Sequence, residues 1–213
     1  MLTSTRAQGR TFTGRLAQVR RWVSNRVGDT RHEHRVMRIA VRLFDLLADE
    51  HGLSHEHRRT LKLAAMLHDV GRMYGSRRHH IRGAKMILSA GPSLPLRRGE
   101  RRIAAYLARY HRGTIPSKDE ATLLADGDDP RAAHVLLAIL RAADTLDNRK
   151  MLPPGLAIRL RGRRLRIRCH VRGQMRRARR VFRNRCKFEM LRRALGVRVR
   201  VRLRHMDDDC GVN

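Results

Sequence analysis

The chain has 213 residues, of which 41% are hydrophobic and 4% aromatic, and its length fits one large domain, or one domain with a small appendage, around an aliphatic core. The formal net charge of +30 at pH 7 indicates a polyanionic partner or substrate, although a genome bias towards arginine would explain it equally well, since only five basic residues are lysines. Three scattered cysteines (Cys169, Cys186 and Cys210) exclude a disulfide framework and a C-x-x-C zinc site. The sequence has no long apolar run, so we expect neither a signal peptide nor a membrane anchor, and a soluble cytoplasmic protein.

Helical periodicity dominates the chain before Pro153. Residues 1–12 have no periodicity and are expected to form a disordered arm, and a helical domain is expected over residues 13–152. Apolar residues recur there at steps of three and four, and glycine or proline ends several of the runs. The expected helices cover residues 16–27, 32–51, 54–67, 79–88, 103–110 and 131–147.

The pattern changes after Pro153-Pro154-Gly155. Apolar residues alternate with arginines around Gly162, which predicts a β-hairpin. A helix is expected from Gln174 to Leu195, and a strand over Val197–Leu203 follows it. Together these elements predict a β-β-α-β unit.

This unit is expected to be a basic subdomain over residues 156–205, ahead of a flexible tail at 206–213. It contains 19 arginines and Lys187 against the single acid Glu189, a net charge of +19. On the last strand, the period of two places valines on one face and arginines on the other. That second face is either a solvated surface or a binding surface for a polyanion. Its members are Arg198, Arg200, Arg202 and Arg204.

The most informative stretch is Leu63–Arg72, an apolar helix that delivers His68 and Asp69 side by side and then meets Gly71. Adjacent helical side chains point about 100° apart, yet both can converge on an ion near the helix end. An imidazole with a carboxylate suits Mn, Fe, Co or Zn. For a lone pair of this kind, a buried hydrogen-bonded histidine followed by an aspartate that caps the turn is the commoner explanation.

Further candidate ligands lie on separate helices, which changes this balance. His32, His79, His111 and Asp144 each lie at an end or a turn of an expected helix, and a helical bundle can gather such positions at one end. Asp147 is expected to be a hydrogen-bond partner of these ligands or a helix cap. Four other histidines are expected on the solvated surface, and they are His34, His51, His55 and His57.

Five ordered motifs make the chain resemble the HD superfamily of metal-dependent phosphohydrolases. They are His32-x-x-Arg35-Val36, His68-Asp69-Val70-Gly71, His79-x-x-x-Gly83-Ala84, Tyr110-His111 and Ala143-Asp144. The resemblance implies a mostly α-helical fold, an HD-type helical bundle followed here by the small β-β-α-β appendage.

Within this superfamily the chain is most similar to the C-terminal HD region of the exopolyphosphatase and guanosine pentaphosphate phosphohydrolase family, over about residues 14–204. The region stands alone here, without the actin-like domains whose glycine-rich loops carry that family's recognised polyphosphate hydrolysis. Arg82 also departs from the family, which tends to carry a histidine there, so one outer ligand is missing. The segments that carry the similarity are Leu43–Asp45, His51–Leu53, Arg78–His80, Ala108–Arg112, Leu140–Asp147, Lys187-Phe188 and Leu195–Val197.

The resemblance implies a divalent metal centre, with Mn, Fe, Co, Zn or Mg as candidate metals. One group of residues would hold a first ion, and a second ion bridged by Asp69 would lie on the side of His79 and His111. The sequence leaves one ion and two ions open. The first group consists of His32, His68, Asp69 and Asp144.

The resemblance also implies catalytic roles for His68, Asp69 and His111, as ligands of the ion that activates water. Phosphate binding is expected from arginines beside the motifs, whose planar forks fit phosphate oxygens. In a chain this rich in arginine, some would lie there by chance. These candidates are Arg72, Arg78, Arg109 and Arg112.

We therefore expect a metal-dependent phosphohydrolase that attacks a phosphorylated nucleotide such as (p)ppGpp, or polyphosphate, with metal-activated water. The alternative is a binding module: an HD scaffold without turnover that holds polyphosphate, or nucleic acid non-specifically, through its basic C-terminal region. The concentrated charge favours binding, and the complete ligand set favours catalysis. The oligomeric state is open, a homodimer included, and no membrane partner is expected.

Overall fold

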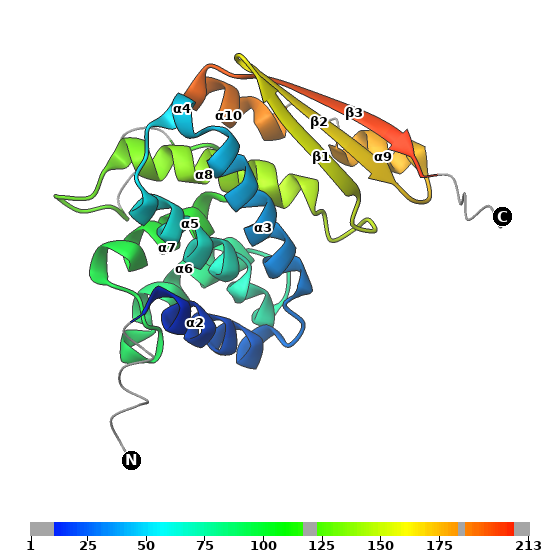
Figure 1. Cartoon of the computed structure of the whole chain (residues 1–213). Helices are drawn as coiled ribbons and strands as arrows, with labels where there is room; N and C mark the ends of the chain where they lie inside the picture. The colour runs from blue at the N-terminus through cyan, green and yellow to red at the C-terminus, as the bar shows by residue number, and fades with distance from the viewer. Residues whose placement is uncertain (1–10, 117–122, 183–185, 207–213) are drawn as a thin grey trace.

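The computed structural model describes residues 11–116, 123–182 and 186–206. Helices make up most of it, and a three-stranded sheet lies in its C-terminal part (Figure 1). The predicted fold class, mostly α with a small β appendage, is therefore confirmed. The predicted arm and tail lie almost wholly outside the described residues. The first helix begins at Phe12, where the side chain of Thr11 accepts a hydrogen bond from the backbone N–H of Gly14.

The helical part follows the predicted order. The fifth long helix, α7, begins earlier than we expected, because Glu100 accepts a hydrogen bond from the backbone N–H of Arg97 and so caps a polar first turn that has no apolar periodicity. The helices are α2 (Phe12–Val27), α3 (Arg31–Leu46), α4 (Ala48–His51), α5 (His55–Leu67), α6 (His79–Ser89), α7 (Arg98–Tyr110) and α8 (Pro130–Leu146), with 3₁₀ turns η1 (Val70–Tyr74) and η2 (Gly91–Ser93).

The helix predicted over residues 32–51 is broken at Leu47, and a histidine explains the break. The ring of His51 is buried, and its Nε2 donates to the carbonyl oxygen of Phe44, 2.9 Å away. A continuous helix would use that carbonyl for the backbone N–H four residues later, so the ring takes over its hydrogen bond. Our expectation that His51 lies on the solvated surface is therefore wrong.

α8 is the central helix of the fold. Nearly all of its residues from Ala132 onwards are buried, including the charged Asp144. The bundle helices α3, α5 and α7 pack on it, and α9 and α10 of the C-terminal region pack on it as well (Figure 1). Asp129 caps its start by accepting from the backbone N–H of Ala132 at 3.0 Å. The core around it is mostly aliphatic, as predicted. No described helix combines the length and the apolar character needed to cross a bilayer.

The C-terminal region forms the predicted β-β-α-β unit. β1 (Gly155–Arg161) pairs antiparallel with β2 (Arg164–Val171), and β2 pairs in parallel with β3 (Arg198–His205). The helix predicted between β2 and β3 is described as two helices, on either side of three residues outside the described ranges. Both lie on the same face of the sheet (Figure 1). They are α9 (Met175–Phe182) and α10 (Cys186–Leu195).

Candidate metal centre

The His-Asp pair lies where α5 ends. His68 caps the helix, Asp69 follows it, and the chain then enters the η1 turn with Gly71. Gly71 packs directly on α6: a β-carbon there would lie 2.1 Å from the carbonyl oxygen of His79 and 2.5 Å from the backbone nitrogen of Gly83. Only glycine permits so close an approach. The contact brings the start of α6, and with it His79, next to Asp69.

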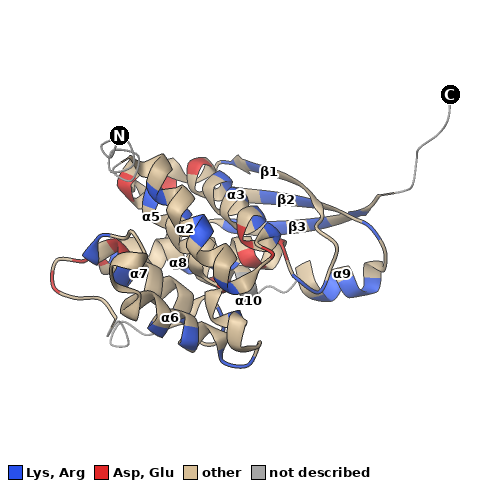
Figure 2. Ribbon diagram, turned by 90° about the horizontal axis from the view of Figure 1, so that it is seen from below, with Lys and Arg blue, Asp and Glu red and all other residues tan. Residues whose placement is uncertain are grey.

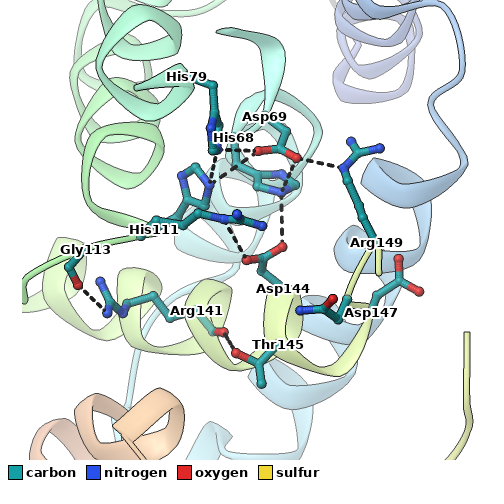
Figure 3. A network of polar contacts seen from close by, with 12 residues as sticks. His68, Asp69, His79, His111, Gly113, Arg141, Asp144, Thr145, Asp147 and Arg149 are labelled. Carbon is teal, nitrogen blue, oxygen red and sulfur yellow. Dashed lines mark hydrogen bonds and ion pairs between the residues drawn. The ribbon is translucent and has the colours of Figure 1, made fainter. Parts of the chain in front are cut away.

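All six predicted ligands come together around this point, and Figure 3 labels five of them, His32 excepted. They arrive from the start of α3, the end of α5, the start of α6, the end of α7 and the last turn of α8. Every one of them is buried, with exposed fractions between 0% and 6%. We call these six residues the cluster; they are His32, His68, Asp69, His79, His111 and Asp144.

Three of these histidines have one ring nitrogen already engaged. Nδ1 of each lies 2.7 to 2.8 Å from the backbone carbonyl oxygen three residues earlier. Since a carbonyl oxygen only accepts, Nδ1 carries a proton in each ring, and Nε2 is the nitrogen that faces the cluster and can bind a metal when the ring is neutral. This arrangement fixes the tautomer and the ring orientation of a metal-binding histidine. The pairs are His68 with Ala65, His79 with Ser76 and His111 with Ala108.

His32 is oriented by a carboxylate. Its Nδ1 donates to Oδ2 of Asp147 at 2.8 Å, and Arg35 donates to the other oxygen of Asp147 at 2.7 Å. Asp147 is buried, and the guanidinium of Arg35 offsets its charge. The predicted role of Asp147 as a partner of the candidate ligands is therefore confirmed as a hydrogen bond. Nε2 of His32 is left facing the cluster with its lone pair.

His32, His68 and Asp144 form a first group that could hold a metal ion. Oδ1 of Asp144 lies 3.3 Å from Nε2 of His32 and 3.7 Å from Nε2 of His68. All three atoms are buried and have no hydrogen-bond partner within the described ranges. Buried acceptors that face one another are unfavourable, and a cation among them would remove this cost. The donor set therefore fits a metal ion.

His68, Asp69 and His111 form a second such group, and His79 lies beside it. Nε2 of His79 lies 3.0 Å from Oδ1 of Asp69 and 3.3 Å from Nε2 of His111. These atoms all carry lone pairs, so they repel one another unless a cation lies among them. Oδ2 of Asp69 faces the first group, 3.8 Å from Nε2 of His32. Asp69 thus touches both groups with different oxygens.

The electrostatics of the cluster favour added positive charge. Burial lowers the pKa of His68, but Asp69 and Asp144 raise it, to about 9 in balance. Burial lowers the pKa of His111 to about 4, so that ring is neutral near pH 7. Burial raises the pKa of Asp69, yet His68, His111 and His79 bring it far below its ordinary range. Without an ion, the ring of His68 is therefore protonated near pH 7, and a divalent transition metal that binds Nε2 would displace this proton.

Arg141, a buried residue of α8, fixes the segment that carries His111. Its guanidinium donates to the carbonyl oxygen of Tyr110 at 2.6 Å and to that of Gly113 at 2.9 Å (Figure 3). These two carbonyls flank His111 in the chain. Arg141 therefore ties the end of α7 to the helix that carries Asp144 and holds the two candidate ligands in register.

Two of the four predicted phosphate-binding arginines lie at the cluster. Nε of Arg72 is 3.7 Å from Oδ2 of Asp69, and Nε of Arg112 is 3.7 Å from Oδ2 of Asp144. Their side chains are 29% and 35% exposed, whereas the carboxylates are nearly or fully buried. Both guanidinium groups therefore lie between the cluster and solvent.

The other two predicted arginines have no described contact with the cluster. Arg78 is exposed and precedes α6 with φ of 52°, a left-handed conformation. The guanidinium of Arg109 lies over the ring of Tyr110, 5.1 Å from its centroid. Their proximity to the motifs in sequence does not translate into contact with the carboxylates.

Arg149, which no sequence pattern singles out, also lies at the cluster. Its Nε donates to Oδ2 of Asp69 at 2.9 Å (Figure 3). Its Nη2 donates to the fully buried carboxylate of Glu33. Arg149 lies just after α8, close to Asp144 in sequence, and Glu33 follows His32 directly. Adjacency to the motifs was the one available signal, and many arginines of this chain share it.

The fold and the cluster define a class: a mostly α-helical protein whose helix ends gather buried histidines and carboxylates that could hold a metal ion. The chain belongs to the Ppx/GppA phosphatase family, since the family model for Ppx/GppA phosphatase, domain III, matches residues 15–162. The resemblance to the HD-type C-terminal region of that family is thereby confirmed. No curated protein matches the chain significantly. The matched residues end with β1, so β2, α9, α10 and β3 lie outside the match.

Proposed function

We propose that the chain is a metal-dependent phosphohydrolase whose substrate is a phosphorylated nucleotide such as (p)ppGpp, or polyphosphate. The observation that carries the proposal is the set of buried, unpartnered acceptor atoms of His32, His68 and Asp144 within the described part of the chain. Atoms of this kind are stable together when a cation lies among them. Membership of the Ppx/GppA phosphatase family supports the reaction class.

In this proposal the six cluster residues hold one or two divalent ions. A bound ion supplies a Lewis acid and lowers the pKa of a water molecule. Asp69 connects the two groups of candidate ligands, and no protein nucleophile is required. The guanidinium groups at the solvent side of the cluster bind phosphate oxygens and offset the charge that develops in the transition state. They are Arg72, Arg112 and Arg149.

The test combines metal analysis of the purified chain with phosphate release from polyphosphate and from (p)ppGpp. We expect bound metal and phosphate release in the wild type, and the loss of both in His68→Ala. His134→Ala is the matched control, because His134 lies on α8, is half-buried, and has no described contact with the cluster. A wild-type chain that takes up none of Mn, Fe, Co, Zn or Mg would refute the metal centre.

A second candidate function is a binding module without turnover. The observation that favours it is the net charge of +19 in residues 156–205. The same assay separates the two functions. Metal uptake with no phosphate release from either substrate favours the binding module, and release that depends on His68 favours the enzyme.

A further inference from the structure

The three-stranded sheet has one apolar face and one face of arginines. Along β2, Leu165, Ile167 and Cys169 are buried, and the residues between them are exposed. α9 and α10 cover the apolar face (Figure 1). β1 and β3 alternate in register with β2. We call the uncovered side the arginine face, and its arginines are Arg159, Arg161, Arg164, Arg166, Arg168, Arg198, Arg200, Arg202 and Arg204.

The strand register aligns these arginines in rows across the sheet. Arg166 on β2 lies opposite Arg159 on β1 and Arg200 on β3. Neighbouring strands are about 4.8 Å apart, and successive side chains on one face of a strand are about 6.6 Å apart. Positive charges therefore adjoin one another both along and across the strands. Figure 2 shows basic residues on all three strands. The neighbouring rows are Arg161, Arg164 and Arg198, and Arg168 with Arg202.

No arginine of this face makes an ion pair or a side-chain hydrogen bond with another residue in the described ranges. Basic residues elsewhere in the subdomain do: Arg163 pairs with Glu50 at 3.4 Å, and Arg192 pairs with Glu189 at 2.6 Å. Glu189 is the one acid in residues 156–205, and it lies on α10, where it pairs with Arg192 and Arg193; it lines a hollow with Arg198 and Arg200 but forms no ion pair with either. Within the described residues, therefore, no acid forms an ion pair with an arginine of this face.

The arginine face is also hollowed, so that a bound ligand could contact arginines of several strands at once. A hollow of about 260 Å³ lies among arginines of all three strands, including Arg159, Arg166 and Arg200. Like charges directly opposite on adjacent strands destabilise a sheet. A bound polyanion would offset this repulsion and would release the counterions that accompany it in solution.

We propose that the arginine face binds a linear polyphosphate chain through its phosphate groups alone. Protein surfaces that bind single-stranded nucleic acid commonly stack its bases on aromatic rings. Besides arginine, this face presents Gly155, Ala157 and His170, and it has no Phe, Tyr or Trp. Arginine donates hydrogen bonds and accepts none, so the donors of base edges would find no partner in it. A phosphate chain without bases offers acceptors alone.

Charge density favours the same ligand. In polyphosphate one bridging oxygen separates successive phosphorus atoms, whereas in nucleic acid a sugar also lies between them. A three-stranded sheet is narrow, so only a short length of ligand can lie across it. Over that length, polyphosphate carries more negative charges than a nucleic acid strand does. The proposal stands apart from the proposed hydrolysis, because it uses none of the cluster residues, and β2 and β3 lie outside the family match.

Two variants of equal net charge test the proposal in the full chain. The face variant is R166Q/R168Q/R200Q/R202Q. The matched control is R176Q/R177Q/R179Q/R180Q, which removes four exposed arginines of α9, the helix on the covered side of the sheet. Binding of long-chain polyphosphate is measured by calorimetry between about 50 and about 200 mM salt. Single-stranded RNA and duplex DNA of the same total charge are titrated in parallel.

We expect the face variant to bind polyphosphate more weakly by about tenfold or more, and the slope of log K against log salt to become shallower by about 3 units, because each phosphate contact to a single strand contributes about 0.7. The control variant should stay within about twofold of the wild type. RNA and DNA should bind the wild type more weakly than polyphosphate does.

Three outcomes would overturn the proposal: equal weakening in both variants, unchanged binding in a folded face variant, or tighter binding of RNA or DNA than of polyphosphate. Circular dichroism establishes folding of each variant. If the face variant fails to fold, the four corresponding Arg→Lys changes keep the charge and remove the planar forks. We expect that variant to bind polyphosphate more weakly than the α9 control does, and equal binding would count against the face.

Discussion

The cluster in the helical bundle and the arginine face of the sheet both concentrate ionisable groups, but they arrange them in opposite ways. In the cluster, the carboxylates of Asp69 and Asp144 lie within 4.0 Å of histidine nitrogens, and none of these groups is more than 8% exposed. On the arginine face, guanidinium groups lie beside one another on exposed residues, with no acid between them.

Under the two proposals, this difference determines how each region would select its ligand. A buried charge needs a partner at a fixed position, so the cluster would select a metal ion by geometry and ligand type. Exposed charges stay hydrated and are screened by salt, so the arginine face would select a polyanion by charge density. Substitutions in the cluster should therefore weaken metal binding by displacing ligand atoms, and this effect should depend little on salt. Substitutions on the arginine face should weaken polyanion binding by removing charge, and this effect should depend strongly on salt.

The largest expected effect is that of His111→Ala. If two ions bind, this change should lower the metal content by about half and turnover by orders of magnitude, because the group of His32, His68 and Asp144 stays intact. Metal analysis and phosphate release measure the two effects separately. Unchanged turnover would leave an enzyme with one ion, in which the second group has no catalytic part.

Gly71→Ala should destabilise the protein by about 1 to 3 kcal/mol, since the new methyl group overlaps the backbone of His79 and Gly83 and moves α6 away. Thermal unfolding measures this change, and metal affinity should fall with it. Gly99→Ala is the control: this glycine lies within α7, its nearest neighbour would be 3.4 Å from the added carbon, and alanine is the better helix former. Equal melting temperatures for the two variants would contradict the close packing.

Asp147→Asn should weaken metal binding by about 10- to 100-fold, because Asp147 orients His32 without being a candidate ligand itself. Competition with a chelator measures the affinity. Asp45→Asn serves as the control, since Asp45 also pairs with an arginine, Arg58, but on the surface away from the cluster. A similar loss in both variants would mean that the hydrogen bond to His32 has no special effect.

The smallest expected effect concerns salt. Added salt screens the repulsion on the arginine face, so the melting temperature of the wild type should rise by a few degrees at most, about 1 to 4 °C. The face variant should respond less, and metal binding to the cluster should change little over the same range. If the melting temperatures of the wild type and the face variant rise equally with salt, repulsion on the arginine face does not affect stability.

The candidate site can be predicted largely from sequence, because its residues lie at helix ends that apolar spacing reveals. His32, His79 and Asp144 are examples: each is polar where a buried helix begins or ends. The arginine that reaches the cluster cannot be predicted in this way. Arg149 contacts Asp69 across 80 residues of sequence, and no local pattern distinguishes it from arginines such as Arg109, which turn elsewhere.

The fold shows the same division between local and non-local information. Alternation predicts which side of β3 carries the arginines, and the structure confirms it. Alternation alone does not predict which strand β3 pairs with or in which register, because both depend on how the connecting helices α9 and α10 pack; the structure shows a parallel pair with β2. The break at Leu47 escapes prediction for a similar reason, since the side chain of His51 replaces a backbone hydrogen bond within an apolar repeat.

Three histidines of the cluster are oriented by carbonyl groups of their own local segments, three residues earlier. His68, His79 and His111 therefore lose their side-chain rotational freedom when the protein folds. This loss of conformational entropy, on the order of 1 kcal/mol per side chain, does not recur when an ion binds. The affinity and the rate of metal uptake should then be set by dehydration of the ion and not by rearrangement of the protein.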